Sequence, residues 1–341
     1  MYEKPYHTAD LKKYAFLITG GAGFIGSNLV EYLMKYKAHR VRVLDNLSTG
    51  HKHNLKDFLS DPAFEFIEGD IRDLETCKKA VADMDFVFHQ AALGSVPRSI
   101  VDPITTNEVN ISGFVNMLVA VKDSGVSRMV YAASSSTYGD SEALPKVEEN
   151  IGNPLSPYAV TKYVNELYAN VFARTYGMEL IGLRYFNVFG PRQDPDGAYA
   201  AVVPKFVQQL LNHQSPVING DGEHSRDFTF IENVVQANML AMFTDNPDSL
   251  NTVYNVAYGE QTSLNQLVRA LKEYLSVSDA AIAGIKALHG PNRDGDIPHS
   301  LASIEKAKAN LNYLPQFNFK EGLRRAIDWY KSNLHYAGTK I

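Results

Sequence analysis

The sequence predicts an α/β fold, in which a doubly wound parallel sheet is followed by a smaller mixed α/β lobe. Six short apolar runs recur in the first 190 residues, at about 15–18, 40–44, 64–67, 85–89, 128–132 and 180–184. Segments with helical spacing separate them, and runs that are apolar throughout are typical of parallel strands covered on both faces. Glycine or polar residues follow each run, which is where ligands bind in such sheets.

A glycine-rich turn follows the first predicted strand. Gly20, Gly23 and Gly26 are spaced three residues apart, and a helical pattern resumes at once through residues 29–34. Such glycines permit a tight turn, a close approach of backbone to pyrophosphate, and close packing of helix on strand. The helix N-terminus, which Phe24 and Ile25 would open, offers unpaired N–H groups to the phosphates. The turn therefore predicts a Rossmann-type dinucleotide-binding unit.

Asp45 ends the second predicted strand, nineteen residues after Gly26. A carboxylate at this place accepts hydrogen bonds from the adenosine ribose and repels a 2′-phosphate. The alternative is a simple turn residue, but the spacing favours the ribose and therefore NAD over NADP. The polar loop that follows could close over the adenosine with Asn46, Ser48, Thr49 and Gly50.

The ends of the third and fourth strands add further candidates. Asp70, next to Ile71, is expected either to hydrogen-bond the adenine amino group or to cap a helix, and the sequence does not separate the two. His89 ends an apolar strand, which favours a structural histidine over a catalytic one. The residues after it, Gln90, Ala91 and Ala92, suit backbone that lies flat against a cofactor.

Composition excludes several classes of protein. The chain has 341 residues, of which 45% are hydrophobic and 21% charged, and a formal net charge of −5 that argues against a nucleic-acid partner. Its single cysteine, Cys77, excludes an intramolecular disulfide, and no Cys/His cluster has the spacing of a metal site. No apolar stretch resembles a signal peptide or a membrane span. We expect a cytoplasmic globular protein without a metal.

The alternation of strands and helices weakens after residue 190. Loops rich in Gly, Pro and Asp separate shorter predicted helices at about 201–211, 231–243, 263–275 and 320–333. The expected division is a dinucleotide-binding domain over 1–190, a substrate-binding lobe over 191–334 and a tail over 335–341. Part of the chain near 225–260 is expected to return to the first domain.

Three side chains form the candidate catalytic group. Tyr158 and Lys162 lie four residues apart on a predicted helix at 156–176, so they share one face, and Ser134 ends the neighbouring strand. Lowering a tyrosine pKa from about 10 to neutral requires roughly 4 kcal/mol of preferential stabilisation of the phenolate. A nearby ammonium and a positive nicotinamide ring act in that direction. Tyr158 would then be a general base, Lys162 would also hold the nicotinamide ribose, and the cofactor would accept hydride.

These motifs together resemble the extended short-chain dehydrogenase/reductase family. TGGAGFIG at 19–26 matches its TGxxGxxG, YAVTK at 158–162 its YxxxK, and RYFNVFG at 184–190 its RYFNxxG, and the resemblance spans about residues 14–333. The segments 90–99 and 132–140 are similar to the nucleotide-sugar 4-epimerases that interconvert UDP-GlcNAc and UDP-GalNAc in bacterial surface-polysaccharide pathways. The resemblance implies an NAD-dependent epimerase and a homodimer formed through helices at about 107–122 and 156–176.

The resemblance also implies roles for individual residues. Tyr185 would join the cofactor site, and Arg226 with Arg293 would grip the diphosphate while Asp296 binds the uridine ribose. An ion pair of Arg226 with Asp227 or Glu232 is the alternative. The implied contacts of the sugar nucleotide are completed by Gly94, Ser95, Ser134, Ser135, Ser136, Tyr158, Asn187, Ala201, Val202, Lys205, Ile218, Asn219 and Ser300.

Departures from the family pattern bear on the substrate. Ser300 stands where hexose-restricted relatives have a bulky aromatic residue, and Gly94 where some have lysine, so both enlarge the sugar pocket for an N-acetyl group. Ser135 and Ser136 replace the Asp-Glu pair of the dehydratase relatives, which argues against loss of water. A UDP-N-acetylhexosaminuronic acid remains an alternative, because Arg98, Lys205 or His299 could meet its carboxylate. A catalytically idle NAD-binding module is a further alternative, against which the intact trio argues.

Overall fold

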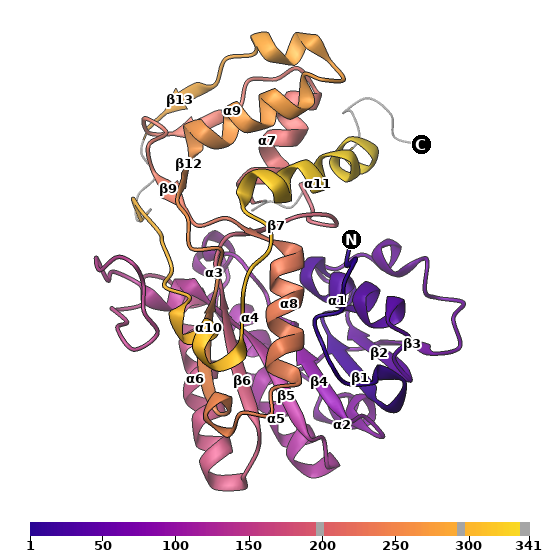
Figure 1. The fold of residues 1–341 in the computed structure, drawn as a ribbon. Coiled ribbons are helices and arrows are strands. Elements are labelled where there is room, and N and C mark those ends of the chain that lie inside the picture. Colours follow the sequence, from indigo (N-terminus) through magenta and orange to yellow (C-terminus); the bar gives the residue numbers. More distant parts are fainter. Residues whose placement is uncertain (196–200, 292–296, 335–341) are drawn as a thin grey trace.

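The computed structural model describes residues 1–195, 201–291 and 297–334, and its centre is a parallel sheet of seven strands (Figure 1). The strand order is β3-β2-β1-β4-β5-β6-β11. The strands are β1 Ala15–Thr19, β2 Arg40–Asp45, β3 Phe64–Glu68, β4 Phe86–His89, β5 Arg128–Ser134, β6 Leu180–Tyr185 and β11 Thr252–Val256. The first six are those predicted from the sequence, and their order is that of a doubly wound dinucleotide-binding sheet. The predicted fold class is confirmed.

Helices cover both faces of this sheet. One face carries α1 Phe24–Lys35 and α8 Ile231–Met242, which pack on each other, and the other carries α2 Leu74–Val81, α5 Gly113–Ser124 and α6 Pro157–Tyr176. The sequence sets the limits of α6 clearly. The Ser156 hydroxyl accepts a hydrogen bond from the N–H of Ala159, Pro157 is the first helical residue, and the left-handed Gly177 ends the helix.

The predicted helix at 107–122 is a composite segment. It comprises the end of α4 Pro103–Asn107, a π-helical turn at Glu108–Ser112 and α5, and the short helix α3 Val96–Val101 precedes it. Asn110 in the π-helical turn is buried and bonds two other segments: its Nδ2 donates to the carbonyl of Leu93 and to Thr161 Oγ1. π-helical turns are frequent at functional sites, and this one lies between α6 and the loop after β4.

The chain after residue 190 divides between the sheet and a second lobe. α8 packs on the sheet, and β11 is its edge strand beside β6. The division at residue 190 and the return of residues near 225–260 to the first domain stay predictions. α10 Glu305–Leu311 packs against α8 and β11. The lobe contains α7 Val202–Leu211, β8 Val217–Asn219, β9 Ser225–Arg226, β12 Thr262–Ser263, α9 Leu264–Leu275, β13 Leu288–Gly290 and α11 Phe319–Asn333. The predicted tail at 335–341 lies outside the described residues.

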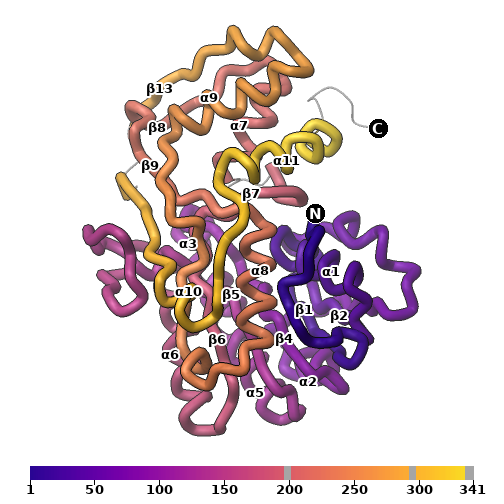
Figure 2. The backbone as a smooth tube through the Cα atoms, viewed as in Figure 1, coloured from indigo at the N-terminus to yellow at the C-terminus, as the bar shows by residue number. Residues whose placement is uncertain are grey.

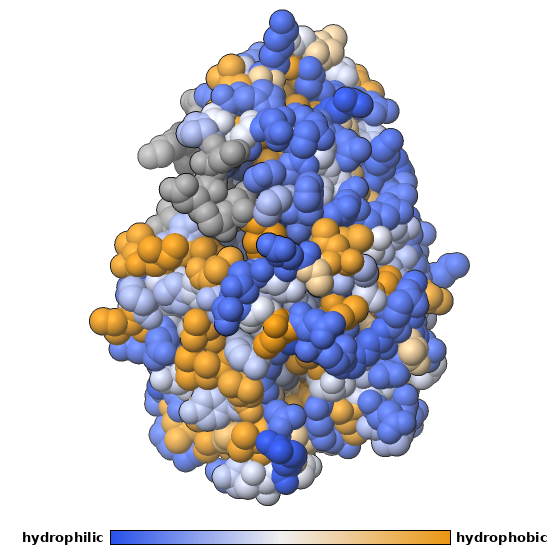
Figure 3. Space-filling model, turned by 90° about the vertical axis from the view of Figure 1, so that its left-hand side faces the viewer, coloured by the Kyte–Doolittle hydropathy of each residue, from blue (hydrophilic) through white to orange (hydrophobic). Residues whose placement is uncertain are grey.

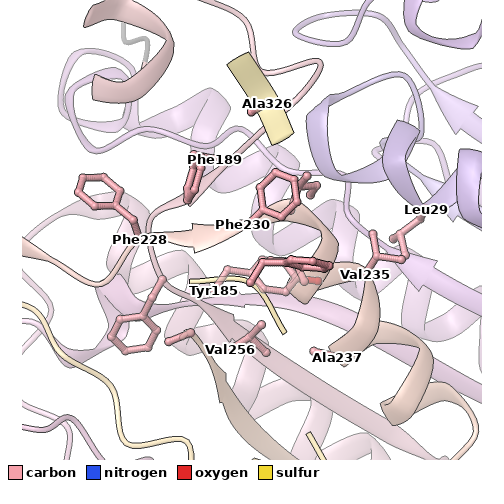
Figure 4. Close-up of a cluster of buried hydrophobic side chains, with 14 of the residues drawn as sticks. Leu29, Tyr185, Phe189, Phe228, Phe230, Val235, Ala237, Val256 and Ala326 are labelled. Atoms are coloured by element: carbon pink, nitrogen blue, oxygen red, sulfur yellow. The ribbon is translucent and has the colours of Figure 1, made fainter. Parts of the chain in front are cut away.

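An aromatic core joins the sheet to the lobe. β7 Val188–Phe189 pairs in parallel with β10 Thr229–Phe230, and the rings of Phe189 and Phe230 lie 5.7 Å apart between α8 and α11 (Figure 4). In α11, Gly322 allows this approach, because a Cβ there would lie 2.6 Å from the Cβ of Phe230. The site residues that follow β6 therefore lie between the sheet and the lobe, and packing against both holds them in place.

The first thirteen residues form an N-terminal arm that lies on the sheet domain. The indigo tube of Figure 2 passes beside α1 and α8 before β1 begins. Three of its residues are buried: Tyr2, Tyr6 and Leu11. Among the described helices, none combines the length and the apolar character that a membrane crossing requires.

Candidate active site

A cavity of about 640 Å³ opens at the carboxyl ends of the strands. Every residue that the sequence assigns to the cofactor lines it. These are the glycine turn and start of α1 (Gly20, Gly23, Phe24, Ile25, Gly26), the end of β2 and its loop (Asp45, Asn46, Ser48, Thr49, Gly50), and Asp70, Ile71, Gln90, Ala91, Ala92, Lys162 and Tyr185. Segments that are far apart in sequence therefore line one cavity.

The glycine turn has the shape that a pyrophosphate requires. Gly20 has a left-handed φ of +68°, and a Cβ on it would lie 2.7 Å from the backbone nitrogen of Ala91. α1 starts directly after Gly23, and no side chain caps its N-terminus. Its first N–H groups face a glycine-lined hollow, so backbone donors and the helix dipole are available to an anion. The residues present fit NAD.

Asp45 holds the turn as well as facing the cavity. Its Oδ2 accepts a hydrogen bond from the N–H of Ala22 at 2.9 Å, and its Oδ1 accepts one from the N–H of Leu47 at 2.8 Å. Burial raises the pKa of this carboxyl, while the two N–H donors oppose the shift. Each oxygen retains a second lone pair that a ribose hydroxyl can use. Asp45 can therefore serve both as a turn residue and as a ligand of the ribose.

Asp70 is not the cap of α2. That cap is Asp73, whose carboxylate accepts from the N–H groups of Glu75 and Thr76. Asp70 instead accepts a hydrogen bond from Asn46 and pairs with Arg72 at 2.8 Å, and the Arg72 guanidinium holds the pKa of the Asp70 carboxyl at about 2. A charged acceptor at the cavity wall remains available to the amino group of adenine.

Ser134 and Tyr158 meet in the cavity as the sequence predicts, but the pKa of Tyr158 is not lowered. Burial raises the pKa of the phenol, and a hydrogen bond with Ser134 offsets only part of this rise. The lowering of this pKa that the sequence analysis expects is therefore not found in the protein by itself. Ser134 also accepts hydrogen bonds from the N–H and hydroxyl of Ser136, which fix its orientation.

Lys162 lies deep in the cavity with only 3% of its surface exposed. Its Nζ donates to the carbonyl of Ala132 at 2.8 Å. Burial lowers the pKa of this ammonium to about 8, and the nearby Glu166 carboxylate opposes the fall. The lysine therefore keeps its charge at neutral pH. His89 bonds Thr19, and burial followed by the charge of Lys162 lowers its pKa to about 3, so this histidine is neutral and structural.

The predicted substrate residues divide into three groups. Gly94, Ser95, Ser134, Tyr158, Asn187 and Ala201 line the cavity, whereas Ser135, Ser136, Val202, Lys205, Ile218, Asn219, Arg226 and Ser300 do not. Arg293 and Asp296 lie outside the described residues. Asn219 precedes a second hollow of about 460 Å³ in the lobe, which is lined by Gly220, Asp221, Glu223, His224, Gly290, Pro298 and His299. The structure thus brings the sugar-side residues to the catalytic group and leaves several nucleotide-side candidates apart from it.

Arg226 and Ser300 are held together in the lobe. The N–H of Ser300 donates to the carbonyl of Ser225, and the Arg226 guanidinium donates to the carbonyls of Ser225 and Pro298. Asp227 accepts instead from the backbone N–H groups of Tyr258, Gly259 and Ala302. Glu232 accepts from the N–H of Tyr2 and the hydroxyl of Tyr6. The two carboxylates considered as alternatives for Arg226 therefore have other partners.

Sequence reasoning missed part of the wall. His51, Gln193 and Asp194 line the cavity, and His51 Nε2 lies 3.1 Å from Asp194 Oδ2. These residues belong to loops after β2 and β7, so no local spacing relates them. The further wall residues that were not predicted are Leu44, Gly69, Leu93, Val109, Ala132, Ala133 and Val188. Across residues 1–195, 201–291 and 297–334, no group of three or more His, Cys, Asp or Glu is placed to hold a metal ion.

Comparisons with known proteins agree with this geometry. The model of the NAD dependent epimerase/dehydratase family matches residues 16–257. The chain is 35% identical over 318 residues to a UDP-glucose 4-epimerase from Mycolicibacterium smegmatis, covering 93% of this chain and 98% of that protein.

Solved structures show the same likeness. A UDP-N-acetylglucosamine 4-epimerase from Methanobrevibacter ruminantium, in complex with UDP-N-acetylmuramic acid, is 38% identical with a TM-score of 0.87, and the match covers 94% of this chain and 98% of that one. A UDP-glucose 4-epimerase from Thermotoga maritima, with UDP-glucose, is 35% identical with a TM-score of 0.86, over 94% and 100% of the two chains. This chain is therefore a member of the NAD-dependent epimerase/dehydratase family, and its cofactor is NAD.

Proposed function

We propose that the protein interconverts UDP-GlcNAc and UDP-GalNAc by epimerisation at C4. The observation that carries this proposal is the meeting of Ser134, Tyr158 and Lys162 in a cavity whose other end has the glycine turn. Similarity to proteins named as 4-epimerases of UDP-sugars supports the reaction type. The N-acetylhexosamine is the finer part of the proposal and rests on the shape of the sugar end.

Tyr158 is the proposed acid and base at the sugar O4. It takes the O4 proton as the C4 hydrogen leaves and returns it in the second half of the reaction. Because burial raises the pKa of the phenol, the phenolate needs stabilisation at the moment of transfer. The hydroxyl of Ser134 donates to it, and Lys162, one helical turn away and charged at neutral pH, supplies a favourable field. Bound NAD supplies the hydride acceptor and donor.

Removal of hydride from C4 would leave a 4-keto sugar. The protein must hold the diphosphate while this sugar rotates in the cavity. We propose that Arg226 provides part of this grip, with Arg293 as its partner, because a guanidinium pairs with phosphate oxygens through two parallel hydrogen bonds. The carbonyls of Ser225 and Pro298 orient the Arg226 fork. The sugar itself would meet a less polar wall and could rotate.

The sugar end of the cavity has room for an N-acetyl group. Gly94 lies on the wall, and among the described residues no atom beyond its chain neighbours stands within 4 Å of the position that a Cβ on it would take. This opening favours UDP-N-acetylhexosamines over a site restricted to UDP-glucose and UDP-galactose.

One residue favours a second candidate substrate. Arg98 lines the same cavity, and its guanidinium could meet the carboxylate of a UDP-N-acetylhexosaminuronic acid. A dehydratase is less well supported. Among the described wall residues, the acidic side chains are Asp45, Asp70 and Asp194, which lie at the end of β2, after β3 and after β7 rather than flanking Ser134.

A substrate panel tests the proposal. UDP-GlcNAc, UDP-Glc and UDP-GlcNAc uronic acid are incubated separately with the purified protein, and the products are followed by proton NMR. We expect the UDP-GalNAc anomeric signal to appear much faster than that of UDP-Gal. Conversion of the uronic acid alone would keep the mechanism and change the substrate. Tyr158→Phe is the control: it should retain NAD and lose turnover by at least two orders of magnitude, as expected when a general base is removed.

A further inference from the structure

The N-terminal arm, residues 1–13, precedes the region matched by the family model, which begins at residue 16. The arm is nevertheless firmly packed. Tyr2 is fully buried and Tyr6 nearly so, and the rings of Tyr6 and Tyr32 stack at 5.7 Å. The N–H of Tyr2 donates to Glu232 of α8 at 2.7 Å, and the N–H of Tyr6 donates to Tyr32 of α1 at 2.6 Å.

One hydrogen-bonded route leads from this arm to the cofactor cavity. The hydroxyl of Tyr2 donates to Oδ1 of Asn28 at 3.0 Å. Nδ2 of Asn28 donates in turn to the carbonyl of Pro191 at 3.1 Å and to that of Phe24 at 2.9 Å. Asn28 is fully buried, so each of its bonds replaces one that water would otherwise make. Tyr2 therefore acts on Pro191 through a single side chain.

Pro191 begins the segment that walls the cavity. Gln193 and Asp194 line it, and residues 190–194 have no helical or strand bonds of their own. α1 also holds this segment through Arg192, which pairs with Glu31 at 2.6 Å and donates to the carbonyl of Ser27. The position of this segment therefore depends on its side-chain contacts with α1. The N-terminal arm holds one of the contacting side chains, that of Asn28.

We propose that the N-terminal arm is a brace that keeps the Pro191–Asp194 wall closed on NAD, with Tyr2 as its positioning residue. The backbone of Tyr2 supports this role. Its φ is +60°, a left-handed conformation that a tyrosine adopts only when its surroundings impose it. In this conformation the N–H of Tyr2 bonds Glu232 while its hydroxyl bonds Asn28. Without the bond from Tyr2, the side chain of Asn28 is held less firmly, so Pro191 leaves α1 more often and the wall opens more often for cofactor release.

The test compares two conservative variants of the full chain. Tyr2→Phe removes the hydroxyl that bonds Asn28. Tyr36→Phe is the matched control, because the Tyr36 hydroxyl donates to the carbonyl of the same Tyr2 but does not touch Asn28 or the wall. Labelled NAD is loaded, chased with unlabelled NAD, and the retained label is counted over time. We expect release from Tyr2→Phe to be roughly fivefold faster than from wild type, the order expected for one buried hydrogen bond.

Tyr36→Phe should release NAD at the wild-type rate even though both variants unfold at lower urea concentration. Unchanged release from Tyr2→Phe, or equal acceleration in both variants, would overturn the proposal. A second measurement needs no variant, since coupling between two sites is reciprocal. NAD should slow hydrogen exchange of the amides in residues 1–7 by a similar factor, and exchange that is indifferent to NAD would also overturn the brace. Neither readout depends on which UDP-sugar is the substrate.

Discussion

Asp227 shows how one buried side chain can hold several parts of a site in place. Its carboxylate has no exposed surface and accepts hydrogen bonds from three backbone N–H groups, in residues 258, 259 and 302. Its own carbonyl accepts from Asn187, which lines the cavity. Desolvation outweighs the N–H donors, so the pKa of Asp227 rises to about 7. The residue next to the proposed diphosphate ligand is thus costly to ionise.

This shift predicts a pH dependence of stability. The folded protein holds a proton on Asp227 between about pH 4 and pH 7 that the unfolded chain releases. The contribution of Asp227 to the free energy of unfolding therefore falls as the pH rises through this window, by up to about 4 kcal/mol for three pKa units. Urea denaturation of wild type and Asp227→Asn at pH 5, 6, 7 and 8 measures it. The stability of wild type relative to the variant should fall from pH 5 to pH 7 and level off towards pH 8, and parallel curves would contradict the assignment.

At the scale of elements, the turn between β1 and α1 shows why glycine is needed at particular places. Gly20 and Gly177 both have a φ of +68°, so both avoid the strain that a side chain meets in the left-handed region. They differ in their surroundings. A Cβ on Gly20 would collide with the backbone of Ala91, whereas a Cβ on Gly177 would meet nothing within 4 Å.

Alanine at these two glycines should therefore have separable effects. Gly177→Ala should lower the free energy of unfolding only by the backbone strain, about 1–2 kcal/mol. It should bind NAD as wild type does. Gly20→Ala must in addition displace the loop that follows β4 or the turn itself. We expect it to lose NAD on gel filtration and to be less stable than Gly177→Ala by calorimetry. Equal stability with intact NAD binding in both variants would show that the turn tolerates a side chain.

At the scale of the whole molecule, one face carries apolar side chains that stay exposed among the residues the structure describes. Figure 3 shows orange side chains gathered on the lower part of this face. The large apolar residues that α3, α4 and α6 expose include Ile100, Val101, Ile104, Val160, Leu167 and Val171. Single exposed apolar residues are ordinary, but a patch of this kind marks an interaction surface. We propose that a second copy covers it, as the predicted pairing of helices at about 107–122 and 156–176 implies.

Charge placed in the middle of this patch should separate the copies. Leu167→Glu with Val171→Glu puts two carboxylates on the exposed side of α6 and should convert a dimer into a monomer, measured by light scattering. Val277→Glu, at an 85% exposed apolar position in the lobe after α9, is the matched control and should leave the mass unchanged. A wild-type protein that is monomeric at micromolar concentration would contradict the proposed pairing.

The sequence by itself determined the first six strands of the sheet, the glycine turn for NAD, and the placing of Ser134, Tyr158 and Lys162 at one edge, whereas the seventh strand, β11, was not predicted. These depend on periodicity, on glycine at particular places and on the rule that parallel strands end at one edge, all of which are local or topological. Only the tertiary structure decided the rest. Asn28 meets Pro191 across 163 residues, and His51 meets Asp194 across 143. The pKa of Tyr158 likewise depends on burial by several segments. Such contacts follow from packing of the whole chain, so no local pattern contains them.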